Sequence, residues 1–405
     1  MLTDSQRDLV KATVPVLREN GVALTSYFYN RMLTNNPDLK ETFNLGHQRS
    51  GAQAQALAGA VLAYAENIDD PSVLMPVVEM VAHKHVSLNI QAPDYNIVGE
   101  NLLHSISEVL EIPMEDDLIT AWGVAYGQLA DIFIETEKRI YEEHQKTTGS
   151  WLGWRKFTVA KKVPESAEIT SFYLKPSDGG PIAPHQAGQY ISVRVMVPEL
   201  GLKQPRQYTV SDSPQPDYIR ISVKREDSKG DKIGGWVSNT LHQNVQEGDE
   251  IDVSAPTGNF FLFDSSKKNV LISGGVGLTP MVAMLNHLVS LNMPQPVQFI
   301  HACRDGKVHA MKQHLKDLKV EHPQLSTMVA YEFPQDSEVK GEDYDVAGRL
   351  DLSTLSDEQL PKDADYYLCG PVPFMQEQHK ALVARGINRA QIHTEAFGTG
   401  GVTFS

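Results

Sequence analysis

The sequence predicts a multidomain chain: an all-α domain, then an antiparallel six-stranded β-barrel, then an α/β domain with a parallel sheet. Three observations support this order. Residues 1–146 show helical spacing of apolar side chains and no convincing strand. Six short strand-like runs, separated by Gly and Pro, lie between residues 157 and 254. From about residue 266, buried strands alternate with helices, which is typical of a parallel sheet.

The size and composition are those of a soluble enzyme with two or three domains. The chain has 405 residues, of which 41% are hydrophobic and 21% are charged. Its net charge of −15 argues against nucleic acids or anionic lipid surfaces as partners. Cys303 and Cys369 form no CxxC pair, so a disulfide framework, a zinc ribbon and a cysteine-ligated cluster are not expected.

We expect no signal peptide at the start of this sequence and no membrane helix in its uncharged span. The residues after Met1 lack the basic and then apolar pattern of a signal peptide. The uncharged span 269–303 is interrupted by Gly, Asn and Pro, so it indicates strand, loop, helix, turn and strand rather than a membrane helix. We therefore expect a cytoplasmic protein.

The helical part begins with a capping box formed by Thr3 and Gln6, and its first helix is expected to end at Gly21. Further helices are expected over residues 22–34, 50–66, from Pro71 onward, 94–110 and 116–145. Polar residues 146–150 form a plausible linker. The six strands of the barrel begin near Phe157, Ile169, Tyr190, Arg206, Tyr218 and Asp249. In the α/β part, strands begin near residues 269, 297 and 365, and helices cover about 280–291, 312–319 and 374–385.

The helix after Pro71 carries an apolar stripe that ends in His85. His83 lies about 200° around the helix from His85, so these two histidines cannot share one ligand. A single histidine at the end of an apolar stripe is either a core residue with its own hydrogen-bond partner or an axial haem ligand. This stretch alone leaves both interpretations open.

A glycine loop marks a candidate nucleotide site. Gly274, Gly275 and Gly277 lie between a buried strand and a helix, where their backbone N–H groups can approach a pyrophosphate. A tight turn without a ligand is the alternative. In the barrel, Arg206-Gln207-Tyr208-Thr209 combines a guanidinium, an aromatic ring and a hydroxyl, although alone it is an ordinary strand. The segment 234–239 could open a helix that faces a second phosphate.

Four motifs in order make the second part of the chain resemble the ferredoxin–NADP reductase family. They are Arg206-x-Tyr208-Thr209, Gly234-Gly235-x-x-Ser238, the loop 274–280, and Cys369-Gly370-Pro371. The resemblance implies FAD on the barrel and NAD(P)H on the α/β domain. It assigns cofactor contacts to Tyr190, Arg206, Gln207, Tyr208 and Thr209 for FAD, and to Gly274, Gly275, Val276, Gly277, Leu278, Thr279, Cys369, Gly370 and Pro371 for the nicotinamide site. Arg206 would pair with an FAD phosphate, and Thr209 would hydrogen-bond the flavin ring.

The helical part resembles a globin, because Tyr29, Phe43, Gln53, Leu57 and His85 occur in globin order. A globin followed by this reductase is similar to the flavohaemoglobin family of nitric oxide dioxygenases across the whole chain. That resemblance includes residues 28–32, Lys84-His85, 95–100 and 121–127. It divides the chain into a globin haem domain (1–146), an FAD-binding barrel (151–264) and an NAD(P)H-binding domain (265–405).

The resemblance also implies a role for each residue near the haem. His85 would bind the iron, with Tyr95 and Glu135 as its proximal relay. Tyr29 would donate a hydrogen bond to bound O2, Gln53 would assist or gate, Leu57 would restrict the pocket, and Phe43 would pack on the haem. Lys84 and Glu395 would lie near the haem–flavin gap, beside Ala396, Phe397, Gly398 and Thr399, with Phe397 on the flavin. Thr399 replaces the Pro of relatives, so the end of that contact is open. The alternatives are that Tyr95 caps a helix, Glu135 lies on a solvated face, and Tyr29 only packs.

The resemblance implies a nitric oxide dioxygenase in which NAD(P)H reduces FAD, FAD reduces haem b, and the oxygen-bound haem converts NO to nitrate. Two alternatives remain: a haem-dependent lipid or other hydroperoxide reductase, and an O2- or NO-binding globin with its own reductase. The expected partners are O2 and NO, with a lipid ligand in the haem pocket as a further possibility. We expect no nucleic acid and no obligate protein partner. The choice between NADH and NADPH is open, because Arg304 would attract a 2′-phosphate and Asp305 would repel it.

Overall fold

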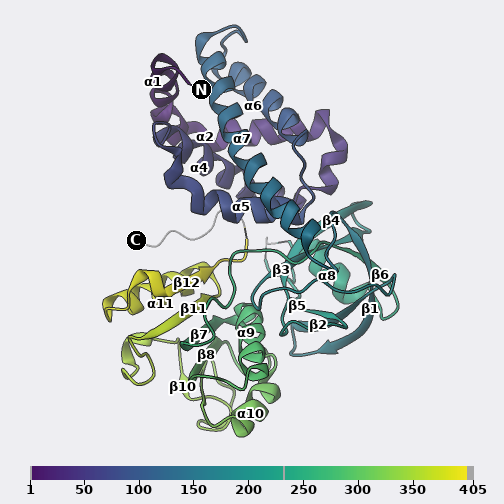
Figure 1. The fold of residues 1–405 in the computed structure, drawn as a ribbon, viewed down its shortest axis with the longest axis vertical. Helices are drawn as coiled ribbons and strands as arrows, with labels where there is room; N and C mark the ends of the chain where they lie inside the picture. The colour runs from purple at the N-terminus through teal and green to yellow at the C-terminus, as the bar shows by residue number, and fades with distance from the viewer. Residues whose placement is uncertain (1, 231–232, 399–405) are drawn as a thin grey trace.

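The computed structural model describes residues 2–230 and 233–398. Its first part is all helical (Figure 1), with α1 (Asp4–Ala12), α2 (Val14–Asn35), α3 (Leu45–Arg49), α4 (Ala52–Glu66), α5 (Met75–Ser87), α6 (Asp94–Leu110) and α7 (Asp117–Lys146), and the short 3₁₀ helices η1 (Pro37–Glu41) and η2 (Pro71–Leu74). The capping box of Thr3 and Gln6 is confirmed.

The predicted helix end at Gly21 is wrong. The first helix ends at Ala12, and Gly21 lies inside α2. A Cβ added to Gly21 would lie 3.4 Å from the Cβ of Ala58. Gly21 therefore lies at the crossing of α2 and α4, where a Cβ would make an ordinary van der Waals contact, and it does not form a turn.

The middle part is an antiparallel sheet of six strands, which confirms the predicted class. The strands are β1 (Arg155–Pro164), β2 (Ile169–Pro176), β3 (Tyr190–Val197), β4 (Leu202–Thr209), β5 (Ile219–Lys224) and β6 (Glu250–Val253), in the order β4-β3-β6-β1-β2-β5. An antiparallel bridge between Val210 and Ile221 joins the two edges, so the sheet closes into a barrel. Helix α8 (Trp236–Gln243) packs its Val237 and Leu241 into the barrel core.

The last described part is a parallel sheet flanked by helices. Its strands are β7 (Lys268–Gly274), β8 (Val297–Cys303), β9 (Leu325–Tyr331), β10 (Val346–Ala347), β11 (Ala364–Cys369) and β12 (Ile392–Glu395), in the order β10-β9-β8-β7-β11-β12. Its helices are α9 (Leu278–Ser290), α10 (Lys312–Glu321) and α11 (Val372–Ala384), with 3₁₀ turns η3 (Gly275–Gly277), η4 (Leu352–Thr354) and η5 (Arg389–Gln391). The strand order reverses between β7 and β11. The carboxyl ends of these two strands form the crevice where such sheets bind nucleotides.

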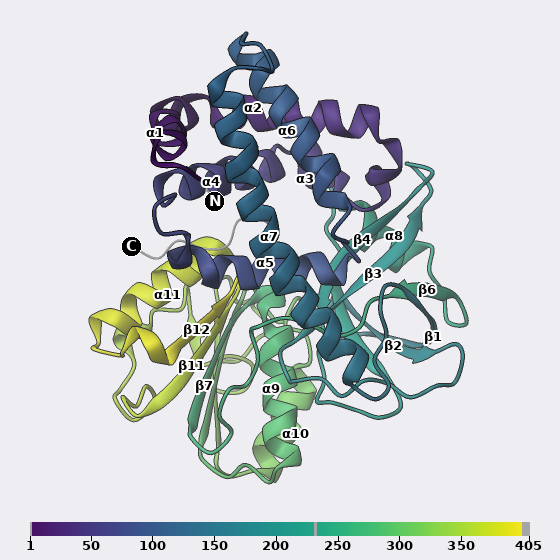
Figure 2. The same cartoon turned by 45° about the horizontal axis from the view of Figure 1, so that its top comes forward.

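Helix α5 lies along the base of the helical domain and faces the other two domains (Figures 1 and 2). Polar contacts also join the η1–α3 region to β4: the amide of Gln204 donates to Lys40 O at 2.7 Å and its oxygen accepts from Leu45 N at 3.1 Å. In the described ranges, no helix is both long and apolar enough to cross a membrane.

Candidate functional site

Three side chains from three helices meet around the predicted iron ligand. The Nδ1 of His85 lies 2.7 Å from Oε1 of Glu137 and 3.1 Å from the hydroxyl of Tyr95. The Tyr95 hydroxyl donates to the same Glu137 oxygen at 2.6 Å. Burial, followed by the charge of Glu137, raises the pKa of Tyr95 far above its usual range, so its hydroxyl stays a donor. These contacts leave Nε2 as the nitrogen of His85 that can bind a metal.

The predicted role of Glu135 in this relay is wrong. Glu135 is exposed, whereas the side chain of Glu137 is only 3% exposed and points to His85. Residues two positions apart on a helix lie about 200° around its axis, so both carboxylates cannot face His85. Helical spacing on α7 could have found the correct residue, because Phe133, Glu137 and Ile140 follow one face. The ring of Phe133 lies 5.7 Å from that of His85.

A second group of predicted residues lies on α2, on α4 and in the segment between them. Tyr29 is 8% exposed, and its ring meets the edge of Phe43 at 5.8 Å. Burial raises the pKa of Tyr29 well above its usual range. A hydrogen bond with the side chain of Gln53 offsets part of this rise. Oε1 of Gln53 is buried and has no hydrogen-bond partner among the described residues. Leu57 packs against the same core. A cavity of about 330 Å³ adjoins Tyr29.

The barrel presents polar groups that suit a flavin nucleotide. Tyr190 of β3 pairs with Thr209 of β4, whose hydroxyl is buried without a partner in the described structure. The guanidinium of Arg206 contacts the Pro205 carbonyl and forms no ion pair within the described residues, and burial lowers the pKa of Arg206 to about 10. Such a cation suits a phosphate. The side chain of Gln207 instead donates to Ser192 at 2.9 Å.

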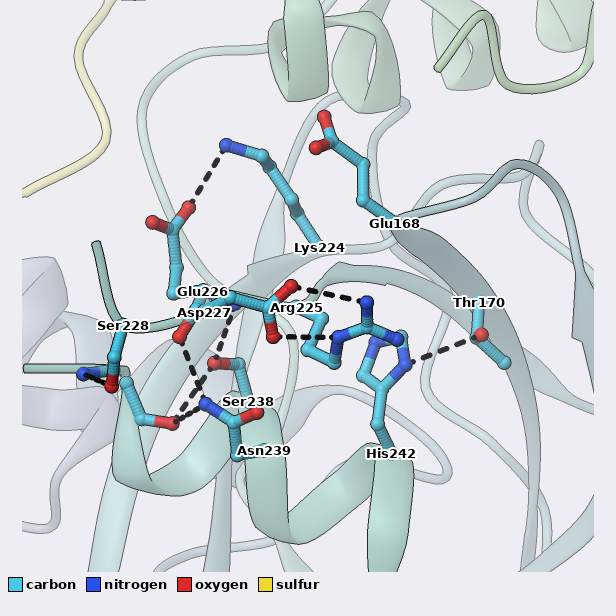
Figure 3. A network of polar contacts seen from close by, with 12 residues as sticks. Glu168, Thr170, Lys224, Arg225, Glu226, Asp227, Ser228, Ser238, Asn239 and His242 are labelled. Atoms are coloured by element: carbon cyan, nitrogen blue, oxygen red, sulfur yellow. Dashed lines mark hydrogen bonds and ion pairs between the residues drawn. The ribbon is translucent and has the colours of Figure 1, made fainter. Parts of the chain in front are cut away.

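The loop before α8 is held by a network of polar contacts (Figure 3). Asn239 donates to the carbonyls of Glu226 and Gly235, and the hydroxyl of Ser238 accepts from the backbone N–H of Glu226. Gly235 N also donates to the Glu226 carbonyl at 2.8 Å. This arrangement fixes the strand–loop–helix connection that contains the Gly234-Gly235-x-x-Ser238 motif.

The glycine loop after β7 approaches the loop after β11 backbone to backbone. A Cβ on Gly277 would lie 2.3 Å from the carbonyl of Cys369, and Gly275 has a φ of +54°. A Cβ on Gly370 would lie 3.1 Å from the backbone of Gly274, and Thr279 donates to Val276 O at 3.1 Å. Only glycine permits this approach, which brings together the two predicted halves of the nicotinamide site, the loop 274–279 and the segment 369–371.

Several charged groups gather where the domains meet. The ammonium of Lys84 lies 3.4 Å from the carbonyl of Gly398, and burial, followed by Arg206, lowers its pKa. Burial raises the pKa of Glu395 to about 8, and its Oε2 has no partner among the described residues. Burial and the two cations lower the pKa of His47, which sequence reasoning missed, to about 4. Ala396 is partly buried and Phe397 is 44% exposed. Thr399 lies outside the described residues.

Each of the three parts of the chain matches a known protein family. Residues 26–133 match the globin family, residues 156–262 the oxidoreductase FAD-binding domain, and residues 271–380 the oxidoreductase NAD-binding domain. The fold and these matches define a class of protein, a globin joined to an FAD- and NAD-binding oxidoreductase.

Full-length relatives narrow the identification. The flavohemoprotein of Bordetella parapertussis is 55% identical over 404 residues, which cover 99% of this chain and 100% of the relative. That of Chromobacterium violaceum is 54% identical over 98% of this chain and 99% of the relative. The crystal structure of flavohemoglobin from Malassezia yamatoensis, with bound FAD and heme, matches with a TM-score of 0.84 and 29% identity, covering 98% and 100% of the two chains. The chain belongs to the flavohemoprotein family.

The residues present fit the cofactors of this family: haem, FAD and NAD. An imidazole held through Nδ1 suits the iron. The buried hydroxyl of Thr209, which has no partner among the described residues, and the guanidinium of Arg206, which pairs with no carboxylate there, suit the flavin and its phosphate. The glycine loop at the sheet crevice suits the nicotinamide nucleotide.

Proposed function

We propose that this flavohemoprotein is an NAD(P)H-dependent nitric oxide dioxygenase that detoxifies NO. The reaction would consume two NO, two O2 and one NAD(P)H, and it would release two nitrate ions, NAD(P)⁺ and one proton. When bound, FAD supplies the conversion of a hydride into single electrons and haem supplies an iron that binds O2. The contact of His85 with the buried Glu137 and Tyr95 carries the proposal.

This contact favours an O2-activating protein over an O2 store. A carboxylate that accepts from Nδ1 makes the imidazole a stronger donor to iron, and electron density pushed toward a bound diatomic favours activation. A store needs only a neutral imidazole. The buried Glu137, which accepts from both His85 and Tyr95, therefore favours an enzyme.

On the other side of the pocket, Tyr29 would donate its phenol hydrogen bond to the bound gas. Burial keeps this phenol protonated, so it remains a donor over the physiological pH range. Gln53 would orient or assist it, and Leu57 would limit the size of the ligand. Phe43, packed on the ring of Tyr29, would hold the phenol in place.

Electrons would pass from the nucleotide loops through the barrel to the helical domain. Lys84 and Glu395 lie at this junction and would shape the path. Among solved structures, the FAD/NAD binding domain of nitric oxide dioxygenase from Vibrio cholerae is 39% identical over 60% of this chain and 98% of that one, with a TM-score of 0.56. That likeness supports the same use of the reductase half here. A lipid ligand and a cytoplasmic location stay predictions.

The test is an NO electrode measurement on protein loaded with haem and FAD, in air with NADH. We expect rapid NO loss with about one nitrate formed per NO, abolished when O2 is removed. Tyr29→Phe keeps the ring and removes the donor, so NO loss should slow while NADH still reduces the haem. Slow NO loss in the wild-type protein despite fast haem reduction would exclude the proposal, and organic hydroperoxides would then be tested as acceptors.

A further inference from the structure

Neighbouring side chains at the end of α5 contact three different parts of the molecule. His85 contacts Glu137 inside the helical domain, and Lys84 reaches the carbonyl of Gly398 beyond β12. His83 points to the barrel, where it meets the segment Thr257–Gly258. The proposed function gives no role to His83.

Two hydrogen bonds join His83 to this segment. Its Nδ1 lies 2.6 Å from the hydroxyl of Thr257 and 3.2 Å from the backbone N of Gly258. An amide N–H can only donate, so Nδ1 is an acceptor. The neutral ring therefore carries its proton on Nε2, and the Thr257 hydroxyl also donates to Nδ1. Thr257 is 1% exposed and Gly258 is buried, so both donors lie on the buried side of this contact, while the ring of His83 is partly exposed.

The segment held by His83 is the direct neighbour of Tyr190. Tyr190 and Thr257 exchange two backbone hydrogen bonds of 2.9 Å each. Gly258 has a φ of +117°, and a Cβ there would lie 2.8 Å from the ring of Tyr190. The carbonyl of Gly258 also accepts from the side chain of Gln189 at 3.0 Å. Movement of this segment would therefore move the wall that Tyr190 forms in the flavin site.

We propose that His83 is a positioning residue that docks the Tyr190 side of the flavin site onto the helix that carries the iron ligand. This role rests on the proposed electron transfer from FAD to haem. His83 and His85 are two residues apart, which is a rise of about 3 Å along a rigid helix. One helix thus holds the iron ligand on one side and the flavin wall on the other, and it sets the separation between the two cofactors.

A second contact between α5 and the barrel limits the structural effect of substituting His83 alone. Ser87 of α5 and Ser192 of β3 are joined by a buried hydrogen bond of 2.8 Å between their hydroxyls. Ser192 also accepts from Gln207. Loss of the His83 bonds would thus loosen the segment Thr257–Gly258 and the Tyr190 end of β3, while Ser192 keeps the rest of β3 attached to α5, and the fold should survive.

The variants are chosen to separate the acceptor from the ring. His83→Leu removes the acceptor and leaves the buried Gly258 N–H unpaired. His83→Asn places Oδ1 where Nδ1 was, since both atoms are two bonds from Cβ, and should restore the docking. His144→Leu is the matched control, because His144 lies close to His83 and makes no hydrogen bond to this segment. Thr257→Val removes only one of the two hydrogen-bond donors to Nδ1 of His83. It takes the place of His83→Leu in the measurements if that variant does not fold.

The first measurement is hydrogen exchange by mass spectrometry on the full protein with haem and FAD, without NADH. In His83→Leu, the peptide that spans Gly258 should exchange about tenfold faster, because its buried amide loses its partner. His83→Asn and His144→Leu should exchange like the wild type. Unchanged exchange in His83→Leu would show that the bond does not dock the segment, and would overturn the proposal.

The second measurement is anaerobic stopped-flow mixing with NADH, in which the flavin and haem absorption bands are followed separately. One hydride carries two electrons, enough for two one-electron reductions of ferric haem. In His83→Leu, FAD reduction should keep its rate and haem reduction should slow about three- to tenfold, with recovery in His83→Asn. Equal slowing of both steps, or of neither, would overturn the positioning role. If wild-type FAD is reduced while its haem stays ferric, the proposed function itself fails, whatever the exchange data show.

Discussion

The sharpest test of the proximal site replaces Glu137 with glutamine. One oxygen of Glu137 accepts both from Nδ1 of His85, at 2.7 Å, and from the hydroxyl of Tyr95, at 2.6 Å. Glutamine can keep an oxygen at the same place, so both hydrogen bonds can survive. The substitution therefore removes the charge of the carboxylate and leaves the geometry nearly unchanged.

The expected effect follows from the difference between charged and neutral hydrogen bonds. A bond to a charged group contributes about 1.5–3 kcal/mol, and a neutral one about 0.5–1.5 kcal/mol. The lost charge thus amounts to about 1–1.5 kcal/mol. Ferric haem carries one more positive charge than ferrous haem, so the carboxylate stabilises the ferric form more. At about 59 mV for each tenfold change in a one-electron couple, Glu137→Gln should raise the haem reduction potential by about 40–65 mV.

The assay is an anaerobic spectroelectrochemical titration of protein loaded with haem and FAD. Glu135→Gln is the matched control, because it removes the same charge from the exposed face of the same helix and should leave the potential unchanged. Glu137→Leu should shift the potential further and lower haem retention, since it leaves two buried donors unpaired. An equal shift in Glu135→Gln and Glu137→Gln, or none in Glu137→Gln, would refute the assignment of Glu137.

Three further predictions concern single side chains. Burial raises the pKa of Glu395 from 4.5 to about 8, so the stability due to its neutral form is full below pH 4.5 and is lost as the pH rises through 8. Glu395→Gln should therefore raise the melting temperature of cofactor-free protein at pH 8 but not at pH 4, and a rise at both would contradict this. Glu168 pairs with Arg304 at the carboxyl end of β8, near where this kind of sheet binds the nucleotide ribose. Glu168→Gln should free the arginine and raise kcat/KM for NADPH about three- to tenfold, with NADH unchanged; an equal change for both nucleotides would contradict it. Burial raises the pKa of Asp252, but hydrogen bonds from two lysines lower it more, to a net value below 3.8. Asp252→Asn should lower the free energy of unfolding by about 2–4 kcal/mol at pH 7 in urea denaturation. That loss should shrink as the pH falls below 3.8, where the wild-type carboxylate also gains a proton, and a constant loss would argue against the charge.

Most of the fold could be predicted from local patterns in the sequence. The alternation of apolar and polar residues and the Gly and Pro between the runs identified the six barrel strands. Strand β5 is buried along nearly its whole length, so a solvent-facing side is not common to all six. The glycine loop 274–277 was also predicted from the sequence, because a close backbone approach requires glycine and a group of glycines is easy to recognise. Strand β9 was missed: its run Leu325–Tyr331 mixes polar residues into a strand whose burial alternates irregularly. Strand β12 has four residues and pairs only with β11, so no periodicity could develop.

At Glu135, the family resemblance and the helical periodicity of α7 point to different carboxylates as the partner of His85. The resemblance supplied a carboxylate in roughly the right place on the last helix. Helical spacing would have chosen between the candidates, because Phe133 and Glu137 are four residues apart and share one face. The exposed fraction of Glu137, 3%, is what helical spacing predicts for that face.

Contacts between domains could not be predicted from any local sequence pattern. His83 and Thr257 are 174 residues apart in sequence, and neither belongs to a recognisable motif. Yet the spacing of His83 and His85 already carried a constraint: side chains about 200° apart on one helix cannot serve the same ligand. If His85 faces the haem, His83 must face something else, and in a chain of three domains the opposite side of that helix is where another domain can pack. The structure puts the flavin barrel there. The same geometry that excluded a shared ligand therefore explains why one short helix can place two redox cofactors relative to each other.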